Sequence, residues 1–396
     1  MSAAGVEAAI AALGDGPLTE ERVTRHVAPL FSRVLAQARD RIYLANHSLG
    51  RPLDATEDDV REGVAAWYAR MGGAWDAWSD EMSAFRARLA TLTNAVRHDC
   101  VVPKTSAGQG LRAILNTYDD VPRVIATRGE FDSLDVILRE YARRGRIALT
   151  LVEPEELASA VDAPVDLVVV SHVIFNTGRI VPRLGEAIAR THRHGGRVLL
   201  DVYHSLGVIP VDVQALDVDF AVGGSYKYLR GGPGACFLYL APRHLDGSLR
   251  TLDIGWFAKR DPFTYRRPDP PELAEGGDAF LESTPPVLTS FQARAGQVFT
   301  LAVGVERLRA YSLDRQRRLA DALAAHGVQA EGATEDRGAF LILTDERAEA
   351  WADALEARGV VADARGRYLR LCPDILTTGA DIAAAAVAVA ATRQRT

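Results

Sequence analysis

Two residues of the chain, Lys227 and Asp201, have types and positions that suit one kind of chemistry. Lys227 lies in VDFAVGGSYKYLRGGPG, just after an apolar run, and Asp201 ends a second apolar run, RVLLD. A lysine amine forms a Schiff base with an aldehyde, and a carboxylate keeps a pyridine nitrogen protonated so that the ring withdraws electrons from a substrate carbon. Together they predict an enzyme that uses pyridoxal 5'-phosphate.

Each residue also has an ordinary structural interpretation. Lysines are usually solvated, and acids that follow strands are commonly helix caps. Glycines on both sides of Lys227, at Gly223 and Gly224 and again from Gly231, favour the cofactor interpretation, because glycine lets the backbone approach a ligand closely. The motif is a hypothesis that its structural context must support.

Several further strings resemble the kynureninase branch of the class V aminotransferase superfamily, which consists of fold-type I pyridoxal phosphate enzymes. These strings are YLANHSLGRP from Tyr43, KTSAGQG from Lys104, SHVIFNTGRI from Ser171, DVYHSLGVIPVDV from Asp201, SYKYLRGGPG from Ser225, GWF from Gly255, STPP from Ser283 and LRLCPDIL from Leu369. The resemblance implies an α/β fold with a mostly parallel seven-stranded sheet sandwiched by helices in a large domain, plus a smaller α+β C-terminal domain.

The order of elements agrees with this fold class. From about residue 100 to residue 204, strand-like and helical runs alternate, as in a parallel sheet covered by helices, whose ligands gather at the carboxyl ends of the strands. Residues 56–94 are predicted to be helical, with an interruption at Gly72 and Gly73. We expect a helical segment over residues 1–45 that packs on the small domain, the large cofactor-binding domain over 46–290, and the small domain over 291–396.

The phosphate group of the cofactor is predicted to lie at the KTSAGQG string. This string follows the strand-like CVV and precedes a helix, so backbone N–H groups and two hydroxyls would face an anion at a helix N-terminus. The same donors also make an ordinary helix cap, and the two roles do not compete. The resemblance assigns the phosphate to Thr105 and Ser106, and adds Tyr226 as a further contact.

The cofactor ring has its own predicted contacts. The resemblance implies that Phe131 stacks on the ring and that His204 lies beside the cofactor. Kynureninases usually continue after this phenylalanine with Pro-Ser/Thr-Asp, whereas this chain continues with Asp132-Ser133-Leu134. Asp132 and Asp135 are both candidates for the place of the displaced acid, and a helix cap or a first-turn charge explains either residue equally well.

Substrate contacts are implied by the resemblance as well. Arg370 matches the arginine that grips the α-carboxylate of an amino-acid substrate, a role that suits the guanidinium fork, and Asn46 is assigned to the substrate too. Trp256 and Thr284 match cofactor-binding segments that reach the neighbouring subunit's site, which implies a homodimer with its active site at the interface.

Size and composition limit the other partners. The 396 residues suffice for two domains, and the net charge of −6 argues against nucleic acid as a partner. The 3 cysteines are too sparse for a disulfide framework, which indicates a reducing compartment. We expect no signal peptide, no membrane partner, no metal site, and a cytoplasmic location.

Four hypotheses are weighed, three of them reactions. The leading hypothesis is a kynureninase-like hydrolase that cleaves the Cβ–Cγ bond of L-kynurenine or 3-hydroxykynurenine. A cysteine desulfurase or C–S lyase is a second, although Cys372 lies in a strand-like run, too tight for the mobile loop that a desulfurase nucleophile needs. An aminotransferase is a third. A non-catalytic relative is disfavoured by the intact Asp201, His204, Tyr226, Lys227 and Arg370.

Overall fold

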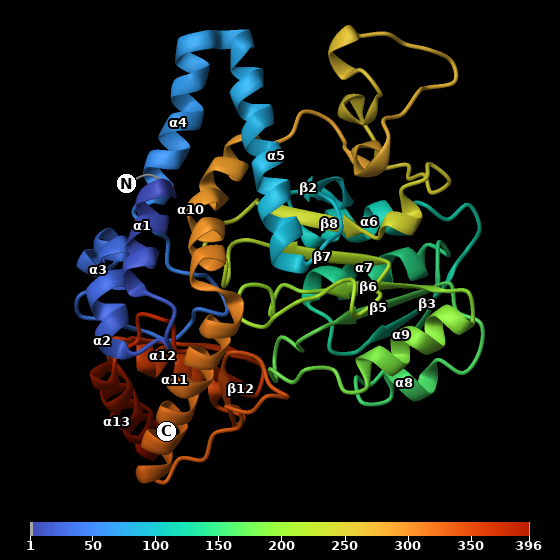
Figure 1. The fold of residues 1–396 in the computed structure, drawn as a ribbon. Helices are drawn as coiled ribbons and strands as arrows, with labels where there is room; N and C mark the ends of the chain where they lie inside the picture. The colour runs from blue at the N-terminus through green and yellow to red at the C-terminus, as the bar shows by residue number, and fades with distance from the viewer. Residues whose placement is uncertain (1–2, 396) are drawn as a thin grey trace.

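The central sheet of the computed structural model, which describes residues 3–395, contains seven strands in the order β2-β8-β7-β6-β5-β3-β4 (Figure 1). β3 to β7 pair in parallel, and β8 runs antiparallel to its neighbours β2 and β7. The predicted mostly parallel, seven-stranded α/β architecture is confirmed. The strands are β2 Val101–Lys104, β3 Arg123–Thr127, β4 Ala148–Val152, β5 Leu167–Ser171, β6 Arg197–Asp201, β7 Phe220–Gly224 and β8 Cys236–Leu240.

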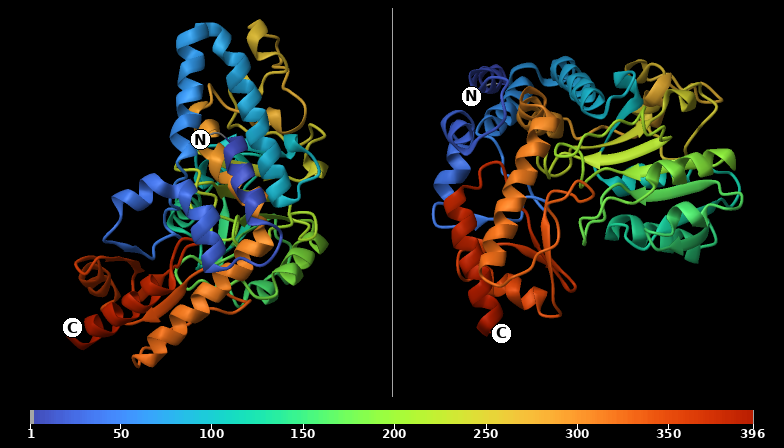
Figure 2. Two further views of the ribbon diagram at one scale, coloured as in Figure 1. Left: turned by 60° about the vertical axis from the view of Figure 1, so that its left-hand side comes forward. Right: turned by 60° about the horizontal axis from the view of Figure 1, so that its bottom comes forward.

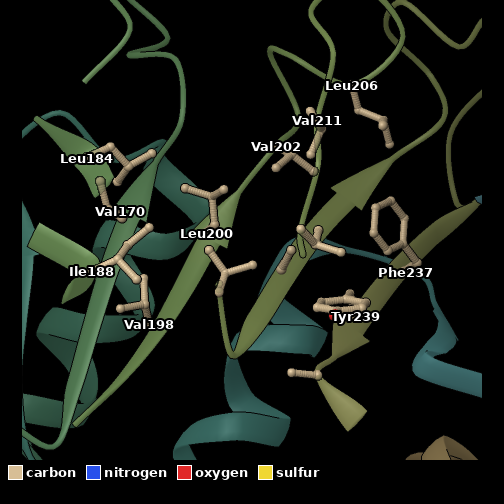
Figure 3. Packing of buried hydrophobic residues seen from close by; sticks show 14 of the residues in the cluster. Val170, Leu184, Ile188, Val198, Leu200, Val202, Leu206, Val211, Phe237 and Tyr239 are labelled. Atoms are coloured by element: carbon tan, nitrogen blue, oxygen red, sulfur yellow. The ribbon is translucent and has the colours of Figure 1, made fainter. Parts of the chain in front are cut away.

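Helices cover both faces of this sheet, which explains why its central strands are continuous apolar runs. Successive side chains of a strand point to opposite faces, so Val168 and Val170 of β5 join one core cluster and Leu167 and Val169 join the other. Figure 3 shows Val170 packing near Leu184 and Ile188 of α9 in the first cluster. The covering helices are α6 Ala107–Leu115, α7 Asp132–Arg143, α8 Leu157–Ala160 and α9 Leu184–Arg193.

The C-terminal unit is built around a second, antiparallel sheet. Its strands follow the order β11-β12-β9, and Asp363 of β11 is the register partner of Arg370 of β12. Long helices connect this unit to the large sheet and cover it (Figure 2). The elements are α10 Leu288–Val303, α11 Val305–Ala325, β9 Leu341–Thr344, α12 Ala348–Glu356, β10 Val360–Val361, β11 Asp363–Arg365, β12 Tyr368–Leu371 and α13 Gly379–Arg395.

The N-terminal segment is helical, but it is divided into short pieces rather than one long helix. α1 Ala3–Leu13 packs along α10, and α2 Glu20–Arg22 leads through a π-helical turn and a 3-10 turn into α3 Ser32–Gln37. Its apolar residues form one cluster with Phe299 of α10 and with Ile375 and Leu376 of the C-terminal unit. After α3, the short strand β1 Ile42–Tyr43 pairs in parallel with β10.

A helical hairpin extends beyond the sheet in Figure 1. It consists of α4 Ala55–Arg70 and α5 Ala74–Thr93, separated by a 3-10 turn that contains Gly72 and Gly73, as the glycine pair predicted. Within residues 3–395, no helix combines the length and the apolar composition that crossing a bilayer requires.

A buried ion-pair cluster ties the segment after β7 to the C-terminal unit. Asp374 accepts a hydrogen bond from Arg230 Nη2 at 2.6 Å and another from Arg51 Nε at 3.1 Å, and its side chain is fully buried. Losing one partner would leave a buried charge uncompensated, so this cluster strongly favours one placement of the two units.

Gly50 fixes the same segment from the other side. Its N–H donates to the Tyr226 carbonyl at 2.7 Å, and a Cβ on it would lie 2.0 Å from the Lys227 carbonyl oxygen. A side chain therefore cannot be added at Gly50 without moving the backbone that carries Lys227.

Gly50→Ala is expected to lower the melting temperature of the cofactor-free protein by several degrees, because relieving such a clash costs about 1–3 kcal/mol. The matched control is Gly185→Ala in α9, where an added Cβ meets no atom within 4 Å. Differential scanning calorimetry checks both. Equal melting temperatures for the two variants would contradict the close approach of Gly50 to Lys227.

Candidate active site

Lys227 lies just beyond β7, at the edge of the sheet where the parallel strands end. Its side chain is buried, and Nζ is 2.8 Å from Nε2 of His204. The ring centroids of Phe131 and Tyr226 lie 5.6 and 5.4 Å from the same nitrogen. In this fold class, the carboxyl ends of the strands are where ligands bind.

Burial makes the Lys227 amine unusually acidic. Loss of solvation, followed by the nearby charge of Arg370, lowers the pKa of Lys227 to about 7, although Asp201 acts in the opposite direction. The same burial holds the pKa of His204 well below its usual value, so its imidazole is neutral. A large share of the Lys227 amine is therefore uncharged and nucleophilic near neutral pH.

Asp201 ends β6, next to β7, and faces the same region. Its Oδ1 accepts a hydrogen bond from the Tyr203 backbone N–H at 2.8 Å. Burial raises the pKa of Asp201 to about 6, while this hydrogen bond and the charge of Lys227 lower it. The carboxyl group is therefore mostly ionised at pH 7, as holding a proton on a pyridine nitrogen requires.

A cavity of about 180 Å³ joins these groups to the residues predicted for the rest of the cofactor. At its phosphate end, Ser106 is the N-cap of α6, and its Oγ accepts the Gln109 N–H at 3.1 Å. The lining residues are Thr105, Ser106, Ala107, Phe131, Ser133, Asp201, Tyr203, His204, Tyr226, Lys227, Pro233, Gly234 and Cys236. The cavity thus combines a helix N-terminus, an aromatic wall and a buried carboxylate.

These residues fit pyridoxal 5'-phosphate. A buried ammonium whose hydrogen-bond partner is a neutral imidazole is poorly stabilised, and an imine bond to the cofactor aldehyde removes that charge. Thr105 and Ser106 would hold the phosphate, Phe131 would cover the ring, and Asp201 would face the pyridine nitrogen.

Four predicted residues lie outside the lining of this cavity. Arg370 donates to the Phe175 carbonyl at 2.5 Å, and the centroid of the Phe175 ring lies 5.4 Å from that of Phe131. Asn46 is buried and lines a separate small cavity. Trp256 Nε1 donates to Thr284 Oγ1 at 3.2 Å within the same chain. The roles assigned to these four residues stay predictions.

Asp132 and Asp135 were the two candidates for the acid displaced from the kynureninase pattern, and that role stays a prediction for both. Both occupy the first turn of α7, and Asp135 pairs with Arg139. Glu130 is a further acid in this region, which the sequence analysis did not identify. It is buried and accepts hydrogen bonds from Thr127 Oγ1 at 2.5 Å and from Ser171 Oγ at 2.7 Å. Burial raises the pKa of Glu130 to about 7.

The only signal for Glu130 in the sequence was its position directly before Phe131, in the turn that follows β3. Its partner Ser171 is the register neighbour of Asp201, so Glu130 belongs to the layer that supports the cofactor acid.

One solved structure with a similar fold contains this cofactor. C-DES, as a lysine-to-alanine mutant with glycine covalently linked to its pyridoxal phosphate, superposes with a TM-score of 0.81 at 20% identity, covering 91% of this chain and 98% of that one. The cysteine desulfurase from Thermococcus onnurineus NA1 gives a TM-score of 0.73 at 16% identity, covering 87% of this chain and 92% of that one. The protein therefore has the fold of the fold-type I pyridoxal phosphate enzymes.

Sequence comparison identifies the family. The Aminotransferase class-V family matches residues 53–341, and the chain belongs to that family. Its cofactor is pyridoxal 5'-phosphate, and its substrate is an amino acid. The chain is 30% identical to the kynureninase of Deinococcus radiodurans over 263 residues, 63% of each chain, and 28% identical to that of Pseudomonas fluorescens over 344 residues, 82% of each. The kynureninase of Bacillus anthracis is 26% identical over 362 residues, 84% of this chain and 83% of that one.

The pKa of Lys227 predicts how the cofactor-free protein captures pyridoxal phosphate. Since the neutral amine is the nucleophile, the capture rate should rise as the pH increases through about 7 and then level off. Stopped-flow recording of the visible absorbance measures this rate. Lys227→Ala should show no visible band, whereas the control Lys259→Ala should retain it. A rate that keeps rising toward pH 10 would mean that Lys227 is solvated.

Proposed function

We propose that the protein is a kynureninase-like hydrolase that cleaves the Cβ–Cγ bond of L-kynurenine or 3-hydroxykynurenine, with water, to L-alanine and an anthranilate-type acid. The observation that carries the proposal is the alignment with kynureninases over 82% and 84% of the chain. The C–S lyase and desulfurase structures, at 16–21% identity, share the fold and are no guide to the reaction.

Lys227 and Asp201 would provide the chemistry common to the class. When bound, the cofactor supplies a protonated pyridine ring that withdraws electrons from the bonds of the substrate α-carbon. Asp201, ionised at neutral pH, would hold the proton on the ring nitrogen. Lys227, with a pKa of about 7, would remove the α-proton as a general base and return it later as an acid.

Tyr226 and the phosphate-binding residues would complete the catalytic groups. Burial raises the pKa of Tyr226 to about 12, so its hydroxyl keeps its proton at neutral pH and can donate it to a developing negative charge. Tyr226 would also contact the phosphate together with Thr105 and Ser106. His204, which is neutral, would orient the Lys227 amine through their 2.8 Å contact. Arg370 and Asn46 would bind the substrate.

The cysteines argue against a desulfurase. Cys100, Cys236 and Cys372 are all buried, and burial raises the pKa of each thiol. Cys372 donates to the Ala339 carbonyl at 3.0 Å and so lies in a fixed position. A mobile thiolate nucleophile requires the opposite environment.

The proposal is tested by incubating the cofactor-loaded protein with L-kynurenine and with 3-hydroxykynurenine. We expect equimolar amounts of L-alanine and of an anthranilate-type acid, the acid being detected by its fluorescence. Lys227→Ala should give neither product. Two parallel reactions test the alternatives. Cystine and cysteine are assayed for release of sulfide and pyruvate, and a 2-oxo acid acceptor is added in an assay for transamination. Turnover in either of these parallel arms without release of anthranilate would replace the hydrolase with a lyase or an aminotransferase.

We also propose that the enzyme works as a homodimer with the active site at the interface. The tip of the α4–α5 hairpin exposes Trp67, Tyr68 and Met71 to 54%, 86% and 67%. Such apolar groups gathered at one tip are typical of a contact surface. Trp256 and Thr284 would then contact the cofactor of the second subunit.

Sedimentation of the loaded enzyme should therefore give twice the mass of one chain. The double variant Tyr68→Glu, Met71→Glu is expected to sediment as a monomer at micromolar concentration, because two charges would have to be desolvated in the contact. The matched control is Val136→Glu, on the exposed side of α7, which should remain dimeric. A dimer that persists in the double variant would exclude the hairpin tip from the interface.

A further inference from the structure

Arg370, the residue proposed to bind the substrate carboxylate, already holds a carboxylate of its own chain. Its Nε and Nη2 donate to the two oxygens of Asp363 at 2.8 and 2.6 Å, and Nη1 donates to the Phe175 carbonyl at 2.5 Å. These bonds use three of the five guanidinium N–H groups and leave one on each terminal nitrogen. One edge of the guanidinium fork is thus closed.

Asp363 is itself held by two further donors. His47 Nε2 lies 2.7 Å from Oδ1, and Ser48 Oγ donates to Oδ2. Each carboxylate oxygen therefore accepts one hydrogen bond from Arg370 and one from the segment that follows β1. These bonds hold the pKa of Asp363 well below its usual value. A substrate carboxylate that displaced Asp363 would have to replace four hydrogen bonds. We therefore expect Asp363 to stay bound to Arg370 when the substrate binds.

The donor His47 adds no charge to this unit. Its side chain is fully buried, and burial, together with the charge of Arg370, lowers the pKa of His47 to about 4. A neutral imidazole that donates from Nε2 to Asp363 has its bare nitrogen at Nδ1, an assignment that follows from the hydrogen bond. The carboxylate of Asp363 and the guanidinium of Arg370 therefore balance each other.

This arrangement adjoins the Lys227 cavity. Asp363 and Arg370 both contribute to the electrostatic field at Lys227, and the Phe340 ring is shared by His47, His204 and Arg370, at 4.9, 6.4 and 5.7 Å. Two buried cations at close range would repel each other, and Asp363 offsets that repulsion.

We propose that Asp363 is the positioning residue of the substrate-carboxylate site: it clamps one edge of Arg370 and directs the remaining N–H groups of that guanidinium to the carboxylate of the amino acid. A guanidinium fixed in this way loses little rotamer freedom when the substrate binds, which favours affinity and excludes other orientations. His47 and Ser48 hold Asp363 in place. This inference rests on the carboxylate role proposed for Arg370, and it is independent of the bond that the enzyme cleaves.

The test compares two ligands that differ only in the carboxylate, L-alanine and ethylamine, titrated into the cofactor-loaded, full-length enzyme. The change in visible absorbance reports the Kd of each. Asp363→Asn is expected to weaken L-alanine by about tenfold or more, because an amide cannot accept both Arg370 bonds, and to change ethylamine by less than about twofold. Ser48→Ala, which removes one of four hydrogen bonds, should give a smaller loss in the same direction.

The matched control is Asp345→Asn, which removes a partly exposed carboxylate paired with Arg347 in the same unit. It should leave the Kd of both ligands unchanged. If Asp363→Asn and Ser48→Ala leave the ratio of the two Kd values as in the native enzyme, Asp363 has a purely structural role and the proposal is wrong. Asp363→Asn alone is informative only if circular dichroism shows it folded, and Ser48→Ala serves where it is not.

Arg370→Ala separates the possible failures. If it also leaves the ratio unchanged, the carboxylate role of Arg370 fails, and the role of Asp363 with it. If it removes the preference for L-alanine while Asp363→Asn does not, only the positioning role fails. Since neither ligand is a kynurenine, an enzyme that does not hydrolyse kynurenine still gives a definite answer.

Discussion

Burial of the Lys227 amine is the physical constraint on which the rest of the site depends. In water this amine would be protonated and unreactive at neutral pH, whereas desolvation at the end of β7 brings its pKa to about 7. That burial costs free energy, and the fold offsets the cost with packing elsewhere. The neutral His204 lies 2.8 Å from the amine and adds no negative charge that would restore the ordinary pKa of Lys227.

The segment that carries Lys227 is held by close backbone contacts and by one buried side-chain ion pair. Gly50 and Gly296 both lie against carbonyl groups of the Lys227 segment, where an added Cβ would come within 2.0 and 1.9 Å of an oxygen atom. Arg230 then ties the segment to the C-terminal unit through Asp374. Contacts of this kind leave little freedom for the segment, so Nζ is fixed by elements from three distant parts of the chain.

Sequence reasoning could find what is encoded locally. Asp201 ends a strand-like run, and Lys227, Thr105, Ser106 and Phe131 follow such runs within a few residues. Parallel strands bring such positions to one edge, so the parallel sheet and the cavity lining were within reach. The pairing of His47 with Asp363 could not be predicted from the sequence. The two residues are separated by 316 positions, and neither lies in a motif that indicates the other. Glu130 was missed because a single acid before an aromatic residue has many structural uses.

The sequence relatives are kynureninases, whereas the solved structures with a similar fold are a C–S lyase and a cysteine desulfurase. Enzymes that catalyse different reactions can use the same cofactor on the same fold, so the match to the Aminotransferase class-V family identifies the class and leaves the reaction open. The choice of reaction depends on which bond of the substrate is aligned with the ring, and alignment is set by the groups that grip the substrate at a distance from the lysine. In this chain the group proposed for this role is Arg370, whose guanidinium donates two hydrogen bonds to Asp363. Differences between relatives in such carboxylate-binding units, rather than in the cofactor contacts, should therefore carry the information about reaction type.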